Sequence, residues 1–207
     1  MNCTGCFCWG ILVLVETKPP VGIWLLDPTA SDNHDLVADL TSLINLVYAK
    51  AEQGLWRTGT PRTNPVELAG LIAAGEIAVA GRNGQLAGSI RIRDVSPDVA
   101  EFGLLVAAPS YRSIGVGRAL VDFAEQSARE RGMHAMQLEL LVPKTWRHPS
   151  KEFLSAWYGR HGYRVIHTRS IHDAYPHLAP LLATPCDLVV YEKPLGVSGG
   201  SRSGSPR

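Results

Sequence analysis

The residues best suited to chemistry lie in the stretch SYRSIGVGRAL, residues 110–120. Arg112 precedes a Gly-x-Gly step made by Gly115 and Gly117, and a long helical pattern follows. A helix N-terminus carries unpaired N–H groups and a partial positive charge, and glycines let a ligand come close to the backbone. These residue types at the start of a helix therefore predict a cradle for a phosphate or pyrophosphate.

Two familiar phosphate-binding motifs do not describe this cradle. The Walker pattern G-x-x-x-x-G-K-[ST] is absent from the sequence. The dinucleotide pattern G-x-G-x-x-G also fails, because the residue three positions after Gly117 is Leu120. A tight strand-to-helix turn without a ligand is the alternative interpretation, but such a turn does not require Arg112.

The elements that must position the cradle follow from hydrophobic periodicity. A buried strand is expected at 100–108, directly before the cradle, and the cradle's helix at about 114–131. The Asn-Gly pair at 83–84 predicts a hairpin over 76–95. Further helices are expected at 31–54 (capped by Ser31 or Asp32), 65–75 and 148–162, and further strands at 21–28, 135–142, 163–169 and 186–194.

This order of elements predicts the fold class. Meandering strands precede a central β-α-β-α segment, and two strands end the domain. We expect a mixed α/β or α+β fold with a twisted, mostly antiparallel sheet flanked by helices, and not a doubly wound parallel sheet. The domain is expected at 21–195, between an N-terminal extension at 1–20 and a disordered tail at 196–207.

Length, charge and cysteine content limit the classes of protein. The 207 residues suffice for one core, and a net charge of +1 gives no footprint for nucleic acid or an anionic membrane. The apolar run at 6–15 is too short to span a bilayer, and no Lys or Arg precedes it as in a signal peptide. The four cysteines, three of them within the first eight residues, form no disulfide framework, so a cytoplasmic protein is expected. None of the seven histidines has metal-ligand spacing with another, and no metal site is predicted.

The stretch LVAAPSYRSIGVGRAL, residues 105–120, resembles the acyl-CoA-binding motif of the GNAT (Gcn5-related N-acetyltransferase) superfamily. A strand, a proline three residues before the arginine, the glycine turn and an amphipathic helix together carry the resemblance, which spans about 21–195. It implies an acyltransferase with acetyl-CoA as co-substrate. It also implies that the turn contacts the pyrophosphate, through Arg112, Ser113, Ile114, Gly115, Val116, Gly117 and Arg118. The strand backbone is implied to contact the pantetheine or acetyl group, at Leu105, Val106 and Ala107.

Three further residues are candidates for acid–base chemistry. The segment AWYGRHGY, 156–163, is similar to the family's F/L-Y-x-K-x-G-F/Y segment, which implies that Tyr158 serves as an acid toward the CoA sulfur. Glu139, in the strand LELLV, matches the glutamate that N-terminal acetyltransferases of this superfamily carry, and is our preferred base. Glu101, at the start of the preceding strand, is the alternative base. The structural alternatives are a core tyrosine and two solvated strand-edge carboxylates.

The sequence leaves the acceptor open. One departure from the family pattern is PKTWRHPSK at 143–151, which lacks the usual asparagine. Arginines and aromatic residues in three loops favour an acceptor with a carboxylate or a flat ring, and they are Trp56, Arg57, Arg62, Trp146, Arg147, His148, Tyr175 and His177. We expect an N-acetyltransferase acting on a small amine or an amino-acid-like molecule. The alternatives are a protein N-terminal or lysine acetyltransferase and a non-catalytic acyl-CoA-binding module, and a homodimer is left open.

Overall fold

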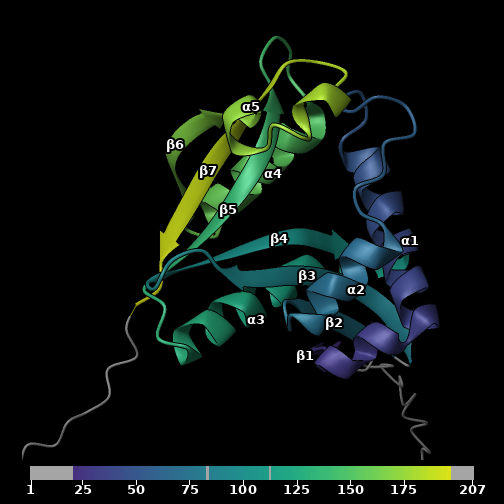
Figure 1. Ribbon diagram of the computed structural model, residues 1–207. Coiled ribbons are helices and arrows are strands. Elements are labelled where there is room, and N and C mark those ends of the chain that lie inside the picture. Colours follow the sequence, from purple (N-terminus) through teal and green to yellow (C-terminus); the bar gives the residue numbers. More distant parts are fainter. Residues whose placement is uncertain (1–20, 83, 112, 197–207) are drawn as a thin grey trace, which may run out of the picture.

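The computed structural model describes residues 21–82, 84–111 and 113–196 (Figure 1). The expected extension at 1–20, almost all of the expected tail and the predicted site residue Arg112 lie outside the described residues. Within the described part of the chain, no helix is both long enough and apolar enough to cross a membrane.

Seven strands form one sheet in the order β1-β2-β3-β4-β5-β7-β6. Every neighbouring pair is antiparallel except β4 and β5, which are parallel. The mixed, mostly antiparallel sheet predicted from the order of elements is therefore confirmed. The strands are β1 Gly22–Leu25, β2 Ile77–Arg82, β3 Gln85–Asp94, β4 Val99–Ala107, β5 Ala135–Pro143, β6 Arg164–Ser170 and β7 Cys186–Pro194.

The helices lie where the periodicity placed them, with one difference at the first. Ser31 and Asp32, which were expected to cap the first helix, belong to a 3₁₀ helix, Pro28–Asp32. The side chain of Asn33 caps α1 instead by accepting from the backbone N–H of Leu36. The local preference of Asp-Pro for a turn explains the later start. The helices are α1 His34–Ala51, α2 Pro65–Ala73, α3 Val116–Glu130, α4 Pro149–Arg160 and a short α5 Ile171–Ala174.

Two apolar layers hold the sheet between helices. On one face, α1 and α2 bury side chains such as Leu40, Ile44 and Ile72 against β2 and β4. On the other face, Leu120 and Ala124 of α3 pack with residues of β2 to β5 and α4. The first half of the sheet is thus covered on both faces, which fixes the position of β4 (Figure 1).

The parallel strands β4 and β5 are joined only at one end. Their register pairs Val99, Ala100 and Glu101 with Ala135, Met136 and Gln137, and the two strands diverge beyond that point (Figure 1). Leu104 has a φ of 46°, and it lies where the register between β3 and β4 shifts. A residue in this conformation inside a bulge bends its strand and increases its twist. The bulge therefore contributes to the opening between β4 and β5.

Close packing at Gly88 generates a stability prediction. A Cβ at this position of β3 would lie 2.4 Å from the backbone oxygen of Val106 and 3.0 Å from Val116 Cγ1. Because the nearest atom belongs to backbone, Gly88→Ala should force β3 and β4 apart and lower the free energy of unfolding by roughly 1–3 kcal/mol. Chemical denaturation measures this change.

The matched control is Gly70→Ala in the interior of α2, where an added Cβ meets nothing within 4 Å. There the substitution should raise the free energy of unfolding by about 0.5–1 kcal/mol, because alanine favours the helix. Equal effects of the two alanine substitutions would contradict the packing assigned to Gly88.

Candidate functional site

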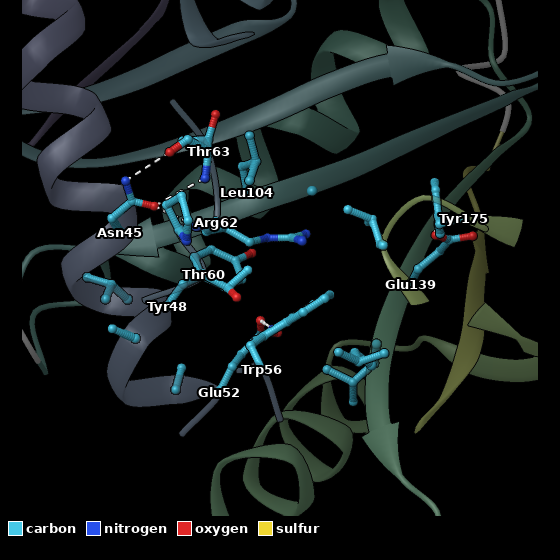
Figure 2. A pocket seen from close by; sticks show the side chains of 18 of the residues that line it. Asn45, Tyr48, Glu52, Trp56, Thr60, Arg62, Thr63, Leu104, Glu139 and Tyr175 are labelled. Carbon is cyan, nitrogen blue, oxygen red and sulfur yellow. Dashed lines mark hydrogen bonds between the residues drawn. The ribbon is translucent and has the colours of Figure 1, made fainter. Parts of the chain in front are cut away.

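A cavity of about 1010 Å³ lies in the opening between β4 and β5. Its walls come from the C-terminal half of α1 and the loop after it, the middle of both strands, one face of α4 and the segment that includes α5. Figure 2 shows Asn45, Tyr48 and Arg62 on one side of this cavity and Glu139 and Tyr175 on the other. Residues far apart in the sequence therefore converge on one enclosed space.

The strand β4 presents its bulge to the cavity. Leu104 and Leu105 line it, whereas Val106 is buried in the core and Ala107 is half-buried. Val106 and Ala107 pair with Ser89 and Gly88 of β3. Since β4 has no registered pairs with β5 beyond Glu101 among the described residues, its backbone groups on that side are free to bind a ligand.

The N-terminus of α3 has the features of an anion cradle. Gly115 is its N-cap residue with a φ of 86°, a conformation that favours glycine, and no described side chain caps the helix. An added Cβ would meet nothing within 4 Å at either Gly115 or Gly117, so a ligand has room to approach. Ser113 and Ile114 are exposed beside them, and Val116 is buried. The exposed N–H groups of this first turn suit a phosphate or pyrophosphate.

Tyr158 lies on the face of α4 that lines the cavity. Its ring is buried and packs at centroid distances of 6.0 Å from both Phe102 and Tyr191. Burial is the largest cause that raises the pKa of its hydroxyl. Because this pKa is raised, the hydroxyl stays protonated at neutral pH. It makes no hydrogen bond to another described residue, so it is available as a donor.

Both predicted carboxylates line the same cavity, and both already have partners. Glu139 accepts a hydrogen bond from Tyr175 at 2.7 Å and forms an ion pair with Arg169. Glu101 binds Arg93 Nε at 2.8 Å and Gln137 Nε2 at 2.9 Å. The structure thus brings Tyr158 and the two glutamates together, but neither glutamate is a solitary carboxylate.

A buried ion pair in the cavity was not predicted from the sequence. Lys151 Nζ lies 2.6 Å from Glu52 Oε1, and both side chains are buried. Trp56 Nε1 donates to Glu52 Oε2 at 2.6 Å. Burial works to raise the pKa of Glu52, but the charges of Lys151 and Arg62 outweigh it and hold that pKa below its usual value. The one sequence signal that Lys151 would reach the cavity was its position on the same helix face as Leu154 and Tyr158.

The predicted acceptor residues divide into two groups. Trp56, Arg57, Arg62, Tyr175 and His177 line the cavity. Trp146, Arg147 and His148 do not line it. The ring of His148 instead packs 5.1 Å from Trp146 and bonds the carbonyl of Gln53 at 3.1 Å, while the side chain of Arg147 is 91% exposed. That loop supports α4 rather than the cavity.

Two segments are joined by backbone hydrogen bonds at the side of the cavity that the α1–α2 loop lines. Arg57 N–H donates to the carbonyl of Leu181 at 2.9 Å, and Ala183 N–H donates to that of Leu55 at 2.9 Å. Trp56 and Leu182 form an isolated antiparallel bridge between these bonds. We refer to 55–57 and 181–183 together as the roof. In the described part of the chain, no cluster of three or more His, Cys, Asp or Glu side chains is arranged to hold a metal ion.

Comparison with known proteins identifies relatives by sequence pattern and by fold. The acetyltransferase (GNAT) family pattern matches residues 47–159, more than half of the chain. Among curated proteins, no sequence matches significantly. The fold is similar to that of yncA, a putative acetyltransferase from Salmonella typhimurium solved with its cofactor acetyl-CoA, with 14% identity, a TM-score of 0.60 and coverage of 91% of this chain and 99% of that one.

Two further solved structures share the fold. The ribosomal-protein-S18-alanine N-acetyltransferase from Escherichia coli has 17% identity and a TM-score of 0.56, and the match covers 88% of this chain and 98% of that one. An aminoglycoside 6'-N-acetyltransferase complexed with coenzyme A has 16% identity and a TM-score of 0.62, with coverage of 89% and 98%. These enzymes differ in the acceptors they are named for, so the shared fold alone does not select an acceptor.

The buried ion pair generates a stability prediction with a defined pH dependence. Lys151→Met should leave the Glu52 carboxylate buried without its cation and lower the free energy of unfolding at pH 7 by about 3–5 kcal/mol. In the wild type the folded pKa of Glu52 is below its usual 4.5. This carboxyl therefore stabilises the wild-type fold above about pH 4.5 and loses that contribution as the pH falls through its folded pKa.

In Lys151→Met the same carboxyl loses its main cation, burial dominates, and its folded pKa should rise. Protonation then favours the folded variant, so the difference from wild type should shrink between pH 7 and pH 5 in chemical denaturation. The control Lys151→Met/Glu52→Leu should recover most of the lost stability at pH 7. A difference that stays constant with pH would contradict the assigned pairing.

Proposed function

This chain belongs to the GNAT acetyltransferase family, and on that premise we propose that it transfers the acetyl group of acetyl-CoA to the amine of a small, amino-acid-like molecule. The roof is the observation that carries the choice of a small acceptor. Backbone hydrogen bonds join 55–57 to 181–183, and on this proposal a peptide chain would have to pass the segments that they tie together. A free small molecule can bind in the cavity without passing them.

The structure also supports roles for the cradle and the bulged strand. Acetyl-CoA supplies an activated acetyl group and a sulfur leaving group. The N–H groups at the start of α3, around Gly115 and Gly117, would hold its pyrophosphate. Ser113, Ile114, Val116 and Arg118 are proposed beside them, together with Arg112. The backbone of Leu105, Val106 and Ala107 would hold the pantetheine arm and polarise the acetyl carbonyl.

Tyr158 is proposed to act on the leaving sulfur. Its raised pKa makes it a poor donor of a whole proton but a constant donor of a hydrogen bond at neutral pH. A hydrogen bond to the sulfur stabilises the negative charge that develops there. The N–C bond forms as the C–S bond breaks, and free CoA is released.

Glu139 is proposed to receive the amine proton, directly or through one water. A carboxylate has about four lone-pair sites, so the bonds from Arg169 and Tyr175 leave room for a substrate proton. Glu139 is preferred because it accepts from Tyr175, one of the residues proposed to face the acceptor. Glu101 bonds Arg93 through both Nε and Nη2 and also Gln137, and it is the alternative base.

The acceptor class is tested by the release of free CoA from acetyl-CoA in the presence of three sets of amines. The sets are free amino acids and small amines, peptides with a free N-terminus, and peptides with an internal lysine. We expect turnover with the first set and little with either peptide set, because the roof excludes a continuing chain. Faster turnover of peptides would replace this proposal with a protein acetyltransferase.

Gly117→Glu is the negative control for that assay. An added Cβ at Gly117 meets nothing within 4 Å, so the variant should fold, but its side chain brings bulk and negative charge into the cradle. Acetyl-CoA should raise the melting temperature of the wild type by mass action and should no longer raise that of the variant. A thermal shift that survives the substitution would show that the pyrophosphate lies elsewhere.

The acid–base roles are tested by Tyr158→Phe and Glu139→Gln. Glu139→Gln should lower kcat by roughly 10² to 10⁴, the size of a general-base contribution. Tyr158→Phe should lower it by roughly 10² to 10³, the size of one hydrogen bond to a developing charge, and neither variant should change acetyl-CoA binding much. Glu139→Gln should also remove the acidic limb of the pH–rate profile, which reports the base.

Glu101→Gln is the matched carboxylate control. Full activity in Glu139→Gln together with a loss in Glu101→Gln would place the base on β4. If neither carboxylate matters, solvent deprotonates the amine, and catalysis depends on proximity and carbonyl polarisation alone.

A further inference from the structure

Most charged side chains in the cavity are neutralised by another charge. Buried or half-buried ionic groups retain their charge at lowest cost when they are paired, and paired groups contribute little net attraction to a ligand. Four ion pairs account for this neutralisation within the described residues, and they are Lys151–Glu52, Arg93–Glu101, Arg91–Glu76 and Arg169–Glu139.

Two arginines of the cavity wall, Arg57 and Arg62, are left without such a partner. Neither guanidinium lies within 4.0 Å of a carboxylate among the described residues, and the guanidinium of Arg62 interacts instead with the side chain of Tyr48. The other carboxylate of the wall near Arg62 is Glu67, whose Oε2 accepts from Thr63 Oγ1 at 3.0 Å. Glu52 and Glu67 act on Arg62 from a distance, but neither forms an ion pair with it, so this wall carries two arginines without a direct carboxylate partner.

The backbone around Arg62 is held by Asn45, and the Arg62 side chain contacts Tyr48. The backbone N–H of Arg62 donates to Asn45 Oδ1 at 2.7 Å, and the neighbouring Thr63 N–H and carbonyl also bind the Asn45 side chain. Its guanidinium lies over the ring of Tyr48, with Cζ 4.9 Å from the ring centroid. Figure 2 shows Asn45, Tyr48, Arg62 and Thr63 together on this wall. The five N–H donors of a guanidinium exceed what the contact with one tyrosine can use, so Arg62 retains donors for a planar, bidentate partner.

The opposite wall carries the proposed base. Glu139 and Tyr175 lie across the cavity from Arg62 (Figure 2). An acceptor with an amine at one end and an anionic group at the other would match these two walls at once. A polyamine would instead bring a second positive charge toward an unpaired arginine, which costs binding free energy.

We propose that the acceptor carries a carboxylate, that Arg62 binds this carboxylate, and that the acceptor's amine faces Glu139. This inference rests on the proposed function and names its substrate class more narrowly, as a free amino acid. Arg62 is then the residue that determines specificity. Arg57, on the same wall, adds attraction without the contacts that Asn45 and Tyr48 make with Arg62.

The test compares each free amino acid with its carboxamide, which keeps the size and the amine but removes the negative charge. The substrates are phenylalanine and phenylalaninamide, and methionine and methioninamide. Because the two forms differ in amine basicity, the readout is how the acid-to-amide ratio of kcat/KM changes between the wild type and each variant. Intrinsic reactivity cancels in that comparison.

Arg62→Gln should lower kcat/KM for the acids roughly 10- to 100-fold, because it removes charge-assisted hydrogen bonds, and should leave the amides nearly unchanged. Arg62→Lys keeps the charge without the fork and should retain part of the preference. The matched control is Arg147→Ala, an exposed arginine outside the cavity, which should keep the wild-type ratio. Melting temperatures with and without acetyl-CoA report whether each variant is folded and binds its donor.

The outcomes separate this inference from the function on which it rests. A fall in the acid-to-amide ratio that is confined to the Arg62 variants supports the inference. An equal loss for acids and amides in Arg62→Gln would overturn it, because Arg62 would then only hold its loop. A wild type that acetylates amines without any dependence of the ratio on Arg62 also overturns it, while the proposed function stands. A wild type that binds acetyl-CoA but acetylates no amine overturns both.

Discussion

The separation of β4 from β5 is the constraint on which the site depends. Their pairing ends at Glu101 and Gln137, and the two halves of the sheet then hold their own ladders on either side of an opening. Backbone groups facing the opening have lost their sheet partners, and in proteins such groups are satisfied by water or by a ligand. The bulge at Leu104 bends β4 where these partners are lost, and Leu104 forms part of the cavity wall. The cavity between the two halves of the sheet is therefore a consequence of strand pairing.

The same pairing explains why the cradle follows the open end of the β4–β5 pair. Parallel strands need a crossover connection, and here α3 provides it between the end of β4 and the start of β5. The helix must begin where β4 ends, which is the open end of the pair. Its N-terminus, with the left-handed Gly115 and the free space at Gly117, is thus next to the unpaired strand backbone. The end of β4 and the start of α3 are consecutive in the sequence, so the unpaired strand edge and the candidate anion site must lie next to each other.

Features that depend on local chemistry could be predicted from the sequence, and those that depend on distant pairing could not. The helix start around Gly115 follows from neighbouring residues, and the resemblance of 156–163 to the family's segment indicated Tyr158. The contact between Lys151 and Glu52 joins residues 99 apart, and Tyr175 reaches Glu139 across 36 residues. No periodicity or turn signal encodes such pairs, because they form only when the sheet and its helices are assembled. Trp146 and Arg147 show the converse error, since residue types that suit a ligand site lie in a loop that packs elsewhere.

The pairing of charges determines what kind of molecule the cavity can accept. Glu101 and Glu139 are already bound to arginines, so the cavity does not attract a polycation as an acidic groove would. Arg62 lies in the loop between α1 and α2, the helices that pack on β2 and β4, while Glu139 lies on β5. A ligand that contacts both therefore spans the opening and bridges the two halves, as the roof does through backbone bonds. The two contacts together require opposite charges at the two ends of one small molecule, which an amino acid provides without any further group.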